Sequence, residues 1–213
     1  MRNLKIKNQN SCHQSGRSMI EMLGVLAIIG VLSVGGIAGY SKAMMKYRIN
    51  KTIEQITLII GNMRTFFANQ RSYDGAVFPT GNDSYKIFQK AKIFPDEMTK
   101  FTDGRLTSAE HAFGGSVAIQ PEDRATEGDK KAFYLQLYNI PENACIELLS
   151  FDWSTVNIGY IDASDLPDFS WKGSKLPIDV DKAVELCALG EGSEKVIEFY
   201  VDIDVNSPLW KDN

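Results

Sequence analysis

The feature that most constrains this chain is an unbroken apolar run close to its N-terminus. Residues 22–41 contain no charged side chain, and about twenty such residues are enough to cross the hydrocarbon core of a bilayer as a helix. No second run of this kind occurs in the sequence. The rest is mixed in polarity, and 23% charged with 10% aromatic residues over the whole chain is typical of a globular protein. The sequence therefore predicts one membrane segment and one soluble domain.

Residues 1–41 allow three interpretations. An ordinary secretory signal peptide would be cleaved after the small-residue pattern at 36–38, but the apolar run is too long for one and Glu21 stands at its beginning. A plain signal anchor is the second interpretation. Basic residues flank the run on both sides, so the positive-inside rule leaves the orientation of such an anchor open.

The third interpretation rests on the residues that precede the apolar run. A short basic leader ends in Gly16, four residues follow, and Glu21 then stands at the start of the run. Together with the sequence GVLAIIGVL at 24–32, this arrangement resembles the processing site and N-terminus of type IV prepilins and type II pseudopilins. The resemblance covers Gly16 to about Lys51. It implies cleavage between Gly16 and Arg17 by a prepilin peptidase and N-methylation of Arg17, which departs from the family's usual apolar residue.

Glu21 is the residue that we expect to direct assembly. A carboxylate in hydrocarbon costs about 3 kcal/mol on insertion scales. Pairing with the free amine of Arg17 on a neighbouring subunit would offset that cost and set the register of a staggered filament. The alternative is that Glu21 simply reaches the membrane interface. Gly35 and Gly39 form a G-x-x-x-G pattern that allows close helix packing in lipid, although glycine is also frequent in ordinary membrane helices.

Apolar residues at steps of three and four after the run predict that the helix continues to residue 69. This stripe, which we expect to pack on a sheet, comprises Met45, Ile49, Ile53, Ile56, Ile59, Ile60, Met63 and Phe67. The turn-rich residues 71–83 end the helix. Further helices are predicted over 85–91, 141–149 and 180–189, and strands over 115–120, 132–138, 156–161 and 195–201, with 121–131 as a loop.

One long helix followed by strands is similar to the order of elements in a pilin head. The expected fold class is α+β, the type IV pilin fold, in which a long N-terminal helix with a membrane half and an amphipathic half packs on an antiparallel sheet. We expect a leader at 1–16, a transmembrane or filament-core helix at 17–41, an amphipathic helix at 42–69 and an extracytoplasmic head at 70–213.

The chain has three cysteines, Cys12, Cys145 and Cys187. If the soluble part lies outside the cytoplasm, Cys145 and Cys187 can form a disulfide while Cys12 stays on the reducing side. Two separate buried thiols are the alternative. The sequence PENAC at 141–145, with Cys187 shortly before a final strand, looks more like type IVb pilins than other branches of the family.

Little else in the sequence points to chemistry. The two histidines are His13, in the leader, and His111, and a lone loop histidine such as His111 is expected to be solvated. No serine has a nucleophile-elbow pattern, and no ligands stand at metal spacing. We therefore expect no enzyme activity, no metal and no cofactor. Removal of residues 1–16 changes the formal charge from −4 to −7, because the leader carries three basic residues and no acid, which argues against a nucleic-acid partner.

The predicted function is that of a structural subunit of a type IVb-like pilus, processed by prepilin peptidase and assembled through its N-terminal helix. The alternatives are a pseudopilin of a type II secretion system and a membrane-anchored extracytoplasmic binding or enzyme domain. The expected partners are copies of itself, other pilins, the prepilin peptidase, an inner-membrane assembly platform and, before assembly, the membrane. The precursor would be a single-pass protein of the bacterial inner membrane, and the product an extracellular or periplasmic filament.

Overall fold

The computed structural model describes residues 19–70, 72–79, 84–122, 130–156, 158–165, 174–188 and 195–202. The chain divides into two compact units, Met1–Met44 and Met45–Asn213, which we call the N-terminal unit and the head. Helix α1 (Met19–Phe67) contributes to both units. Gly16 and Arg17 of the predicted processing site lie outside the described residues.

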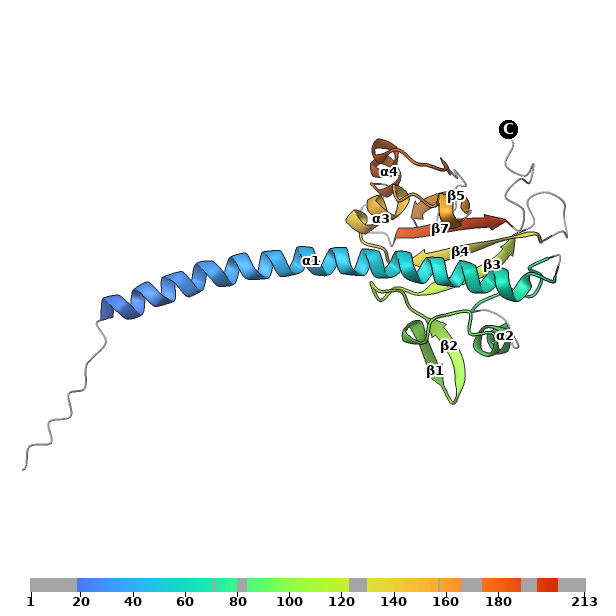
Figure 1. Ribbon diagram of the computed structural model, residues 1–213, viewed down its shortest axis with the longest axis horizontal. Helices are drawn as coiled ribbons and strands as arrows, with labels where there is room; N and C mark the ends of the chain where they lie inside the picture. Colours follow the sequence, from blue (N-terminus) through green and yellow to red (C-terminus); the bar gives the residue numbers. More distant parts are fainter. Residues whose placement is uncertain are drawn as a thin grey trace, which may run out of the picture. The chain divides into compact units, whose positions relative to one another are not determined.

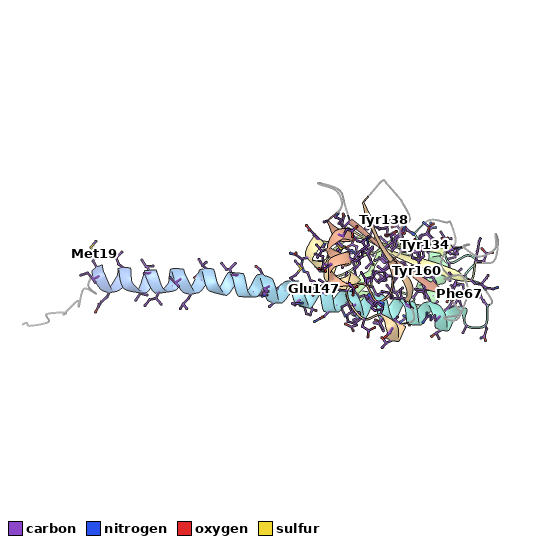
Figure 2. All side chains as sticks on the ribbon, turned by 90° about the horizontal axis from the view of Figure 1, so that it is seen from above. Met19, Phe67, Tyr134, Tyr138, Glu147 and Tyr160 are labelled. Atoms are coloured by element: carbon purple, nitrogen blue, oxygen red, sulfur yellow. A yellow bond between two sulfur atoms is a disulfide. The ribbon has the colours of Figure 1, made fainter. Side chains whose placement is uncertain are left out.

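The N-terminal unit consists, in its described part, of the first half of α1. Every large apolar side chain from Met19 to Tyr40 is more than half exposed, and Figure 2 shows these side chains standing off the helix from Met19 onwards. An exposed apolar surface of this size is costly in water. By length and composition, this is the one described helix that could cross a membrane, as the sequence predicts.

Over the described residues, the head contains a five-stranded antiparallel sheet (Figure 1). Its strand order is β3 (Val117–Glu122), β4 (Ala132–Tyr138), β7 (Lys195–Asp202), β5 (Ile158–Asp165) and β6 (Ser174–Lys175). The last strand in the sequence, β7, lies in the middle and pairs with β4 on one side and with β5 on the other. Residues 195–202 therefore join the β3–β4 pair to the β5–β6 pair.

One face of this sheet forms the core with the part of α1 that belongs to the head. Successive residues of a strand point to opposite faces, and the core-facing residues of β4 and β7 are fully or almost fully buried: Phe133, Leu135, Leu137, Ile197, Phe199 and Val201. They share one hydrophobic cluster with the buried stripe of α1, which includes Ile49, Ile56, Ile59, Ile60, Met63 and Phe67. The predicted packing of an amphipathic helix on an antiparallel sheet is confirmed.

The opposite face of the sheet carries a polar network. Glu198 is 2% exposed and accepts hydrogen bonds from Gln136 Nε2 and from the Tyr200 hydroxyl, while the Tyr138 hydroxyl donates to Gln136 Oε1 at 3.0 Å. Burial, followed by the nearby Glu198 charge, raises the pKa of Tyr134 to about 12. Tyr134 and Tyr138 are labelled on the sheet in Figure 2. Buried polar groups that bond to one another in this way specify a single arrangement of neighbouring strands.

In the sequence, the remaining elements come before β3 or after β4. Helix α2 (Ser84–Lys90), the short helix η1 (Asp96–Met98) and the hairpin of β1 (Thr99–Thr102) and β2 (Arg105–Ala109) precede β3. Helix α3 (Glu142–Leu149) and the short helix η2 (Ser154–Val156) follow β4, and α4 (Val180–Cys187) precedes β7. The predicted helices over 85–91, 141–149 and 180–189 correspond to α2, α3 and α4.

Several predicted boundaries differ from the structure. The hairpin of β1 and β2 was not predicted, because its strands are short and mostly exposed, although Asp103 and Gly104 form a typical two-residue hairpin turn with positive φ at both positions. Strand β3 continues through Pro121, since an edge strand tolerates proline. Val156 belongs to η2 rather than to a strand, because its N–H donates to the Trp153 carbonyl in a tight turn.

Candidate functional site

Glu21 lies in the first turn of α1, with its side chain exposed. It is the only acidic residue among residues 19–44. A carboxylate in the first turn of a helix is favoured by the helix dipole, so this position suits a charged Glu21 before it meets any partner. The pairing of Glu21 with the amine of Arg17 on another subunit stays a prediction.

Gly35 and Gly39 also lie on the described part of the N-terminal unit. A Cβ atom added at either position would meet no atom within 4 Å. The fold of the chain itself therefore does not require glycine at these two positions. Their predicted role in packing against other helices is a separate expectation, and it stays a prediction.

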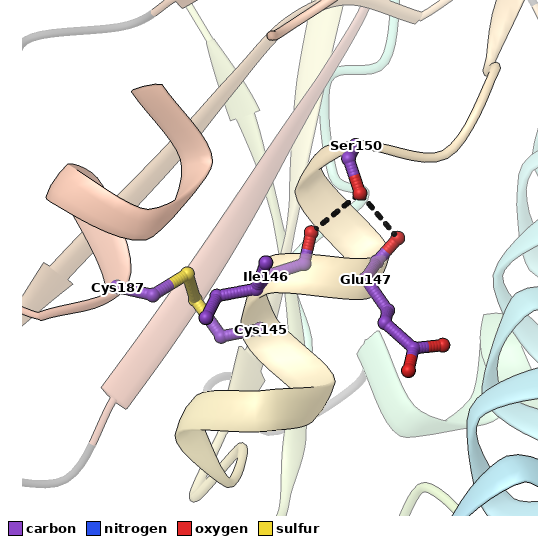
Figure 3. Close-up of a disulfide and its surroundings, with 5 residues drawn as sticks. All are labelled: Cys145, Ile146, Glu147, Ser150 and Cys187. Atoms are coloured by element: carbon purple, nitrogen blue, oxygen red, sulfur yellow. Dashed lines mark hydrogen bonds between the residues drawn. A yellow bond between two sulfur atoms is a disulfide. The ribbon is translucent and has the colours of Figure 1, made fainter. Parts of the chain in front are cut away.

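Cys145 and Cys187 form the predicted disulfide, which joins α3 to the end of α4 (Figure 3). Their Cα atoms are 5.9 Å apart, and the two cysteines are 42 residues apart in the sequence. Both side chains are fully buried, so the bond belongs to the core of the head. Disulfides persist in oxidising compartments, which agrees with a head outside the cytoplasm.

An ion pair close to this disulfide joins α1 to α3 near the start of the head. Lys46 Nζ lies 2.6 Å from Glu147 Oε2 of α3, two residues beyond Cys145. The last turn of α3 is closed by the Ser150 hydroxyl, which donates to the Ile146 carbonyl at 2.7 Å (Figure 3). Because both charged side chains are partly exposed, the pair contributes at most about 1 kcal/mol, and its main effect is to orient α1 against α3.

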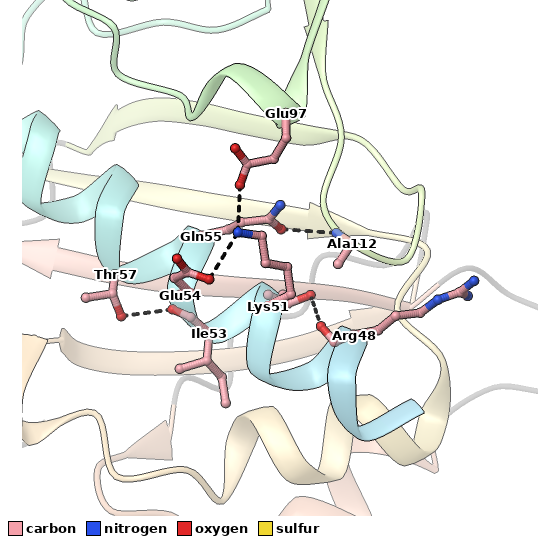
Figure 4. A network of polar contacts seen from close by, with 9 residues as sticks. Arg48, Lys51, Ile53, Glu54, Gln55, Thr57, Glu97 and Ala112 are labelled. Atoms are coloured by element: carbon pink, nitrogen blue, oxygen red, sulfur yellow. Dashed lines mark hydrogen bonds and ion pairs between the residues drawn. The ribbon is translucent and has the colours of Figure 1, made fainter. Parts of the chain in front are cut away.

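A second set of contacts holds α1 on its other side (Figure 4). Lys51 Nζ lies 2.9 Å from Glu97 Oε1 of η1 and 3.0 Å from Glu54 Oε2. Hydrogen bonds with Glu97 and then Glu54 raise the pKa of Lys51 to about 12, and the bond from Lys51 lowers the pKa of Glu97. Gln55, which is 3% exposed, accepts a hydrogen bond from the Ala112 N–H at 3.1 Å.

Two further side chains attach α1 near its C-terminal end. Asn62 Nδ2 donates to the carbonyls of Lys92 and Ile93 at 3.2 and 3.1 Å. Arg64 Nη1 donates to the Val156 carbonyl at 2.8 Å. The head portion of α1 is thus bound by polar contacts to α3 and η2 on one side and to the segment from α2 to β3 on the other.

His111 was expected to be solvated, and the structure shows that this expectation was wrong. Its side chain is 3% exposed, and Nε2 lies 2.6 Å from the Tyr138 carbonyl oxygen. Nδ1 accepts a hydrogen bond from the Phe113 N–H at 3.2 Å. Burial lowers the pKa of His111, partly opposed by the Tyr138 bond and by Glu110. The loop before β3 folds back on β4. No local sequence pattern predicts this contact, because the two segments are 27 residues apart.

Most of these polar contacts had no signal in the sequence. Lys46 and Glu147 are 101 residues apart, and Gln55 and Ala112 are 57 apart, so no local pattern links them. The one available sign was Gln55 itself, which interrupts the apolar stripe of α1 and is buried. A polar side chain on a core-facing position requires a hydrogen-bond partner. In the part of the chain that the structure describes, no group of three or more His, Cys, Asp or Glu residues could hold a metal ion.

An apolar helix that continues into the core of an antiparallel α+β head is the architecture expected of a type IV pilin. The family described as PilS N terminal matches residues 46–198. The chain therefore belongs to this family of type IV pilins.

The chain is also similar to individual pilins and pilus subunits. The chain is 25% identical over 154 residues to the major structural subunit of the bundle-forming pilus of Escherichia coli O127:H6, and equally to that of Escherichia coli O111:H-, covering 72% of this chain and 73% of each relative. A type IV b pilin from Salmonella typhi aligns with a TM-score of 0.46 at 16% identity, over 67% of this chain and 97% of that one. TcpA, a type IV pilin from Vibrio cholerae El Tor, aligns with a TM-score of 0.48 at 13% identity, over 72% and 98%.

Proposed function

We propose that this protein is a structural subunit of a type IVb-like pilus and that it assembles through α1. The observation that supports this most is the division of α1: the large apolar side chains from Met19 to Tyr40 are exposed, while one stripe of side chains from Ile49 to Phe67 is buried in the core of the head. A helix exposed in this way needs lipid or other helices around it. The curated relatives are major subunits of a bundle-forming pilus, which favours a pilus over a secretion pseudopilus.

The proposed maturation begins with removal of the leader at 1–16. A prepilin peptidase would cleave between Gly16 and Arg17, and Arg17 would be N-methylated. Residues 17–41 would span the inner membrane before assembly, with residues 42–69 and the head domain at 70–213 outside the cytoplasm. The buried disulfide between Cys145 and Cys187 supports this orientation, because the cytoplasm keeps thiols reduced.

Assembly in this proposal is directed by Glu21. Moving residues 17–41 out of lipid and into a bundle of identical helices leaves one carboxylate per subunit in apolar surroundings, and an unpaired charge there costs at least about 3 kcal/mol. The amine of Arg17 on a neighbouring subunit would neutralise it. Since only one acid is present in this stretch, the pairing would select a single axial register. The subunit itself would have a structural and not an enzymatic role.

Mass spectrometry of the purified mature chain tests the processing. We expect a polypeptide that begins at Arg17, carries one methyl group on its amine and contains the disulfide. A mature chain that still begins at Met1 would contradict the proposal. Glu21→Ala tests the assembly, and Glu185→Ala, which removes an exposed acid of α4, is its control.

The Glu21→Ala variant should leave the head folded and abolish or cripple filament formation, while Glu185→Ala should still assemble. Filaments that form equally well without Glu21 would refute the proposed role of this residue. Detection of long surface fibres that contain this chain would distinguish a pilus from a secretion pseudopilus. If the chain were a membrane-tethered binding domain instead, Glu21→Ala would leave its activity intact.

A further inference from the structure

We propose that His111 makes the loop at residues 110–115 an acid-sensitive latch, which holds α1 and the end of β4 together at neutral pH and opens when the imidazole ring takes up a proton. This inference goes beyond the proposed pilus function and does not depend on it, because it concerns contacts within the head alone. His111 is the only histidine in the chain apart from His13 near the N-terminus.

The latch is built around a neutral imidazole ring whose two nitrogens have different roles. Nε2 donates its hydrogen to the Tyr138 carbonyl, because a carbonyl oxygen can only accept. Nδ1 then carries the lone pair and accepts the Phe113 N–H. The ring is 3% exposed, so both bonds are shielded from water. Both ring nitrogens are therefore engaged, and a second proton can bind only if the bond from the Phe113 N–H to Nδ1 breaks.

The surrounding backbone closes the loop tightly on the ring. The His111 N–H donates to the Gly115 carbonyl at 3.0 Å, and the Gly114 N–H donates to the His111 carbonyl at 2.8 Å. Gly115 lies so close to β4 that an added Cβ would come within 1.8 Å of the Tyr138 oxygen and 2.5 Å of His111 Nε2. The loop therefore has no room for a side chain at position 115 in this closed form.

The same loop holds α1. Ala112, the residue after His111, donates its N–H to the buried Gln55 side chain, and Gln55 also contributes a hydrogen bond that lowers the pKa of Glu97. Figure 4 shows Ala112 joined to Gln55, beside the Lys51–Glu97 ion pair. A change at His111 is thus one residue away from the contacts that hold α1 against this side of the head.

The charges around the loop are few. Among the described residues, Glu110 has an electrostatic effect on His111 that favours the protonated ring, but Glu110 Oε2 is also 3.4 Å from Lys100 Nζ of β1. On the α1 side, the Lys51–Glu97 pair is the nearest charged group that the hydrogen bonds reach, through Gln55. Within the described residues, the hydrogen bonds of the ring are to backbone groups of Tyr138 and Phe113 and not to an acidic side chain.

The proton-dependent step follows from this geometry. A proton binds to the Nδ1 lone pair, the Phe113 N–H···Nδ1 bond breaks, and two N–H groups then point at each other. The cationic ring also has to be hydrated, which requires the loop to move away from β4. Ala112 moves with it, so the hydrogen bond from the Ala112 N–H to Gln55 Oε1 is lost. In this tautomer Nδ1 is the ring nitrogen that can take up a proton, so the latch opens in acid and not in base.

Amide hydrogen exchange of the full chain in detergent micelles tests the latch. Between about pH 7.5 and about pH 5, the protection factors of the Ala112 and Phe113 amides should fall by about tenfold or more, the factor that corresponds to one unit of pKa. The Cys145 amide, which bonds to the Pro141 carbonyl in α3, is the internal control and should keep its protection.

The matched variant is His111→Gln, whose carboxamide has one donor and one acceptor but takes up no proton in this range. Its loop amides should keep the same protection at both pH values. Should this variant fail to fold, the ring signals of His111 in the wild-type chain provide the second measurement, and they should titrate below 6.5, together with the loss of loop protection. A loop whose protection in the wild-type chain does not change with pH, or changes equally in His111→Gln, would overturn the proposal.

Discussion

The disulfide between Cys145 and Cys187 gives the most direct stability prediction. We consider the double variant Cys145→Ala/Cys187→Ala, which removes the bond and leaves two small apolar side chains in a buried place. The bond closes a segment of 42 residues. In the chain-entropy description, releasing a loop of this length from the unfolded state lowers the free energy of unfolding by about 4 kcal/mol. For a chain of this size, that corresponds to a decrease in Tm of roughly 8–16 °C.

The assay is thermal and denaturant unfolding of the full chain in detergent micelles, with and without a reductant. The reductant should lower the Tm of the wild-type chain to nearly that of the double variant and should not affect the variant. The double variant should lower the stability of the head and leave Glu21 unaffected, since Glu21 lies in the N-terminal unit. A decrease of less than about 1 kcal/mol, or a variant that still responds to reductant, would refute the reasoning from loop closure.

Three further changes test the contacts of the head. Burial lowers the pKa of His111 in the folded state below its usual 6.5, so the unfolded chain binds the proton more readily. The stability that the neutral ring contributes should therefore be complete above pH 6.5 and should decrease as the pH falls from there towards the folded-state pKa. Unfolding midpoints of His111→Gln should show no such decrease. Gly115→Ala should destabilise the head by about 1–3 kcal/mol, because its Cβ would collide with the Tyr138 backbone. The control Gly61→Ala, at an exposed helix position with open space around it, should instead raise the denaturation midpoint, since alanine has a helix propensity about 1 kcal/mol better than glycine. Equal effects of the two substitutions would contradict the close approach of Gly115 to Tyr138. Gln55→Leu should cost about 1–3 kcal/mol, because it leaves the Ala112 N–H without its acceptor, and an unchanged free energy of unfolding would show that water replaces Gln55.

The regular elements of the head could be predicted where the hydrophobic pattern was strong. The stripe from Ile49 to Phe67 has helical spacing and is buried against the sheet, and the core-facing residues of β4 and β7 recur at every second position, which is the spacing of a strand. The hairpin of β1 and β2 was missed because β1 is mostly exposed and β2 buries only Leu106 and Ala109. These two residues are three positions apart, so β2 lacks the period-two alternation that indicates a strand.

The contacts that hold α1 in the head could not be predicted for a different reason. Lys46, Lys51 and Gln55 are ordinary helix residues, and their partners lie in α3, in η1 and in the loop before β3. A hydrogen bond depends on which segments the fold brings within about 3 Å of each other, and that distance is a property of the assembled head. The burial of His111 belongs to the same class, since it follows from the approach of its loop to Tyr138.

By itself, the sequence determined the division of this protein into an apolar helix and an α+β head, the lone Glu21 at the start of that helix, and the two cysteines available for a disulfide. These are local properties, because the length of an apolar run and the spacing of a stripe follow directly from the order of residues. Only the tertiary structure decided that the C-terminal strand β7 occupies the middle of the sheet, that Glu147 meets Lys46, and that His111 is buried between Phe113 and Tyr138. Each of these depends on how segments far apart in the chain pack together, and packing is decided by the burial of the whole core at once.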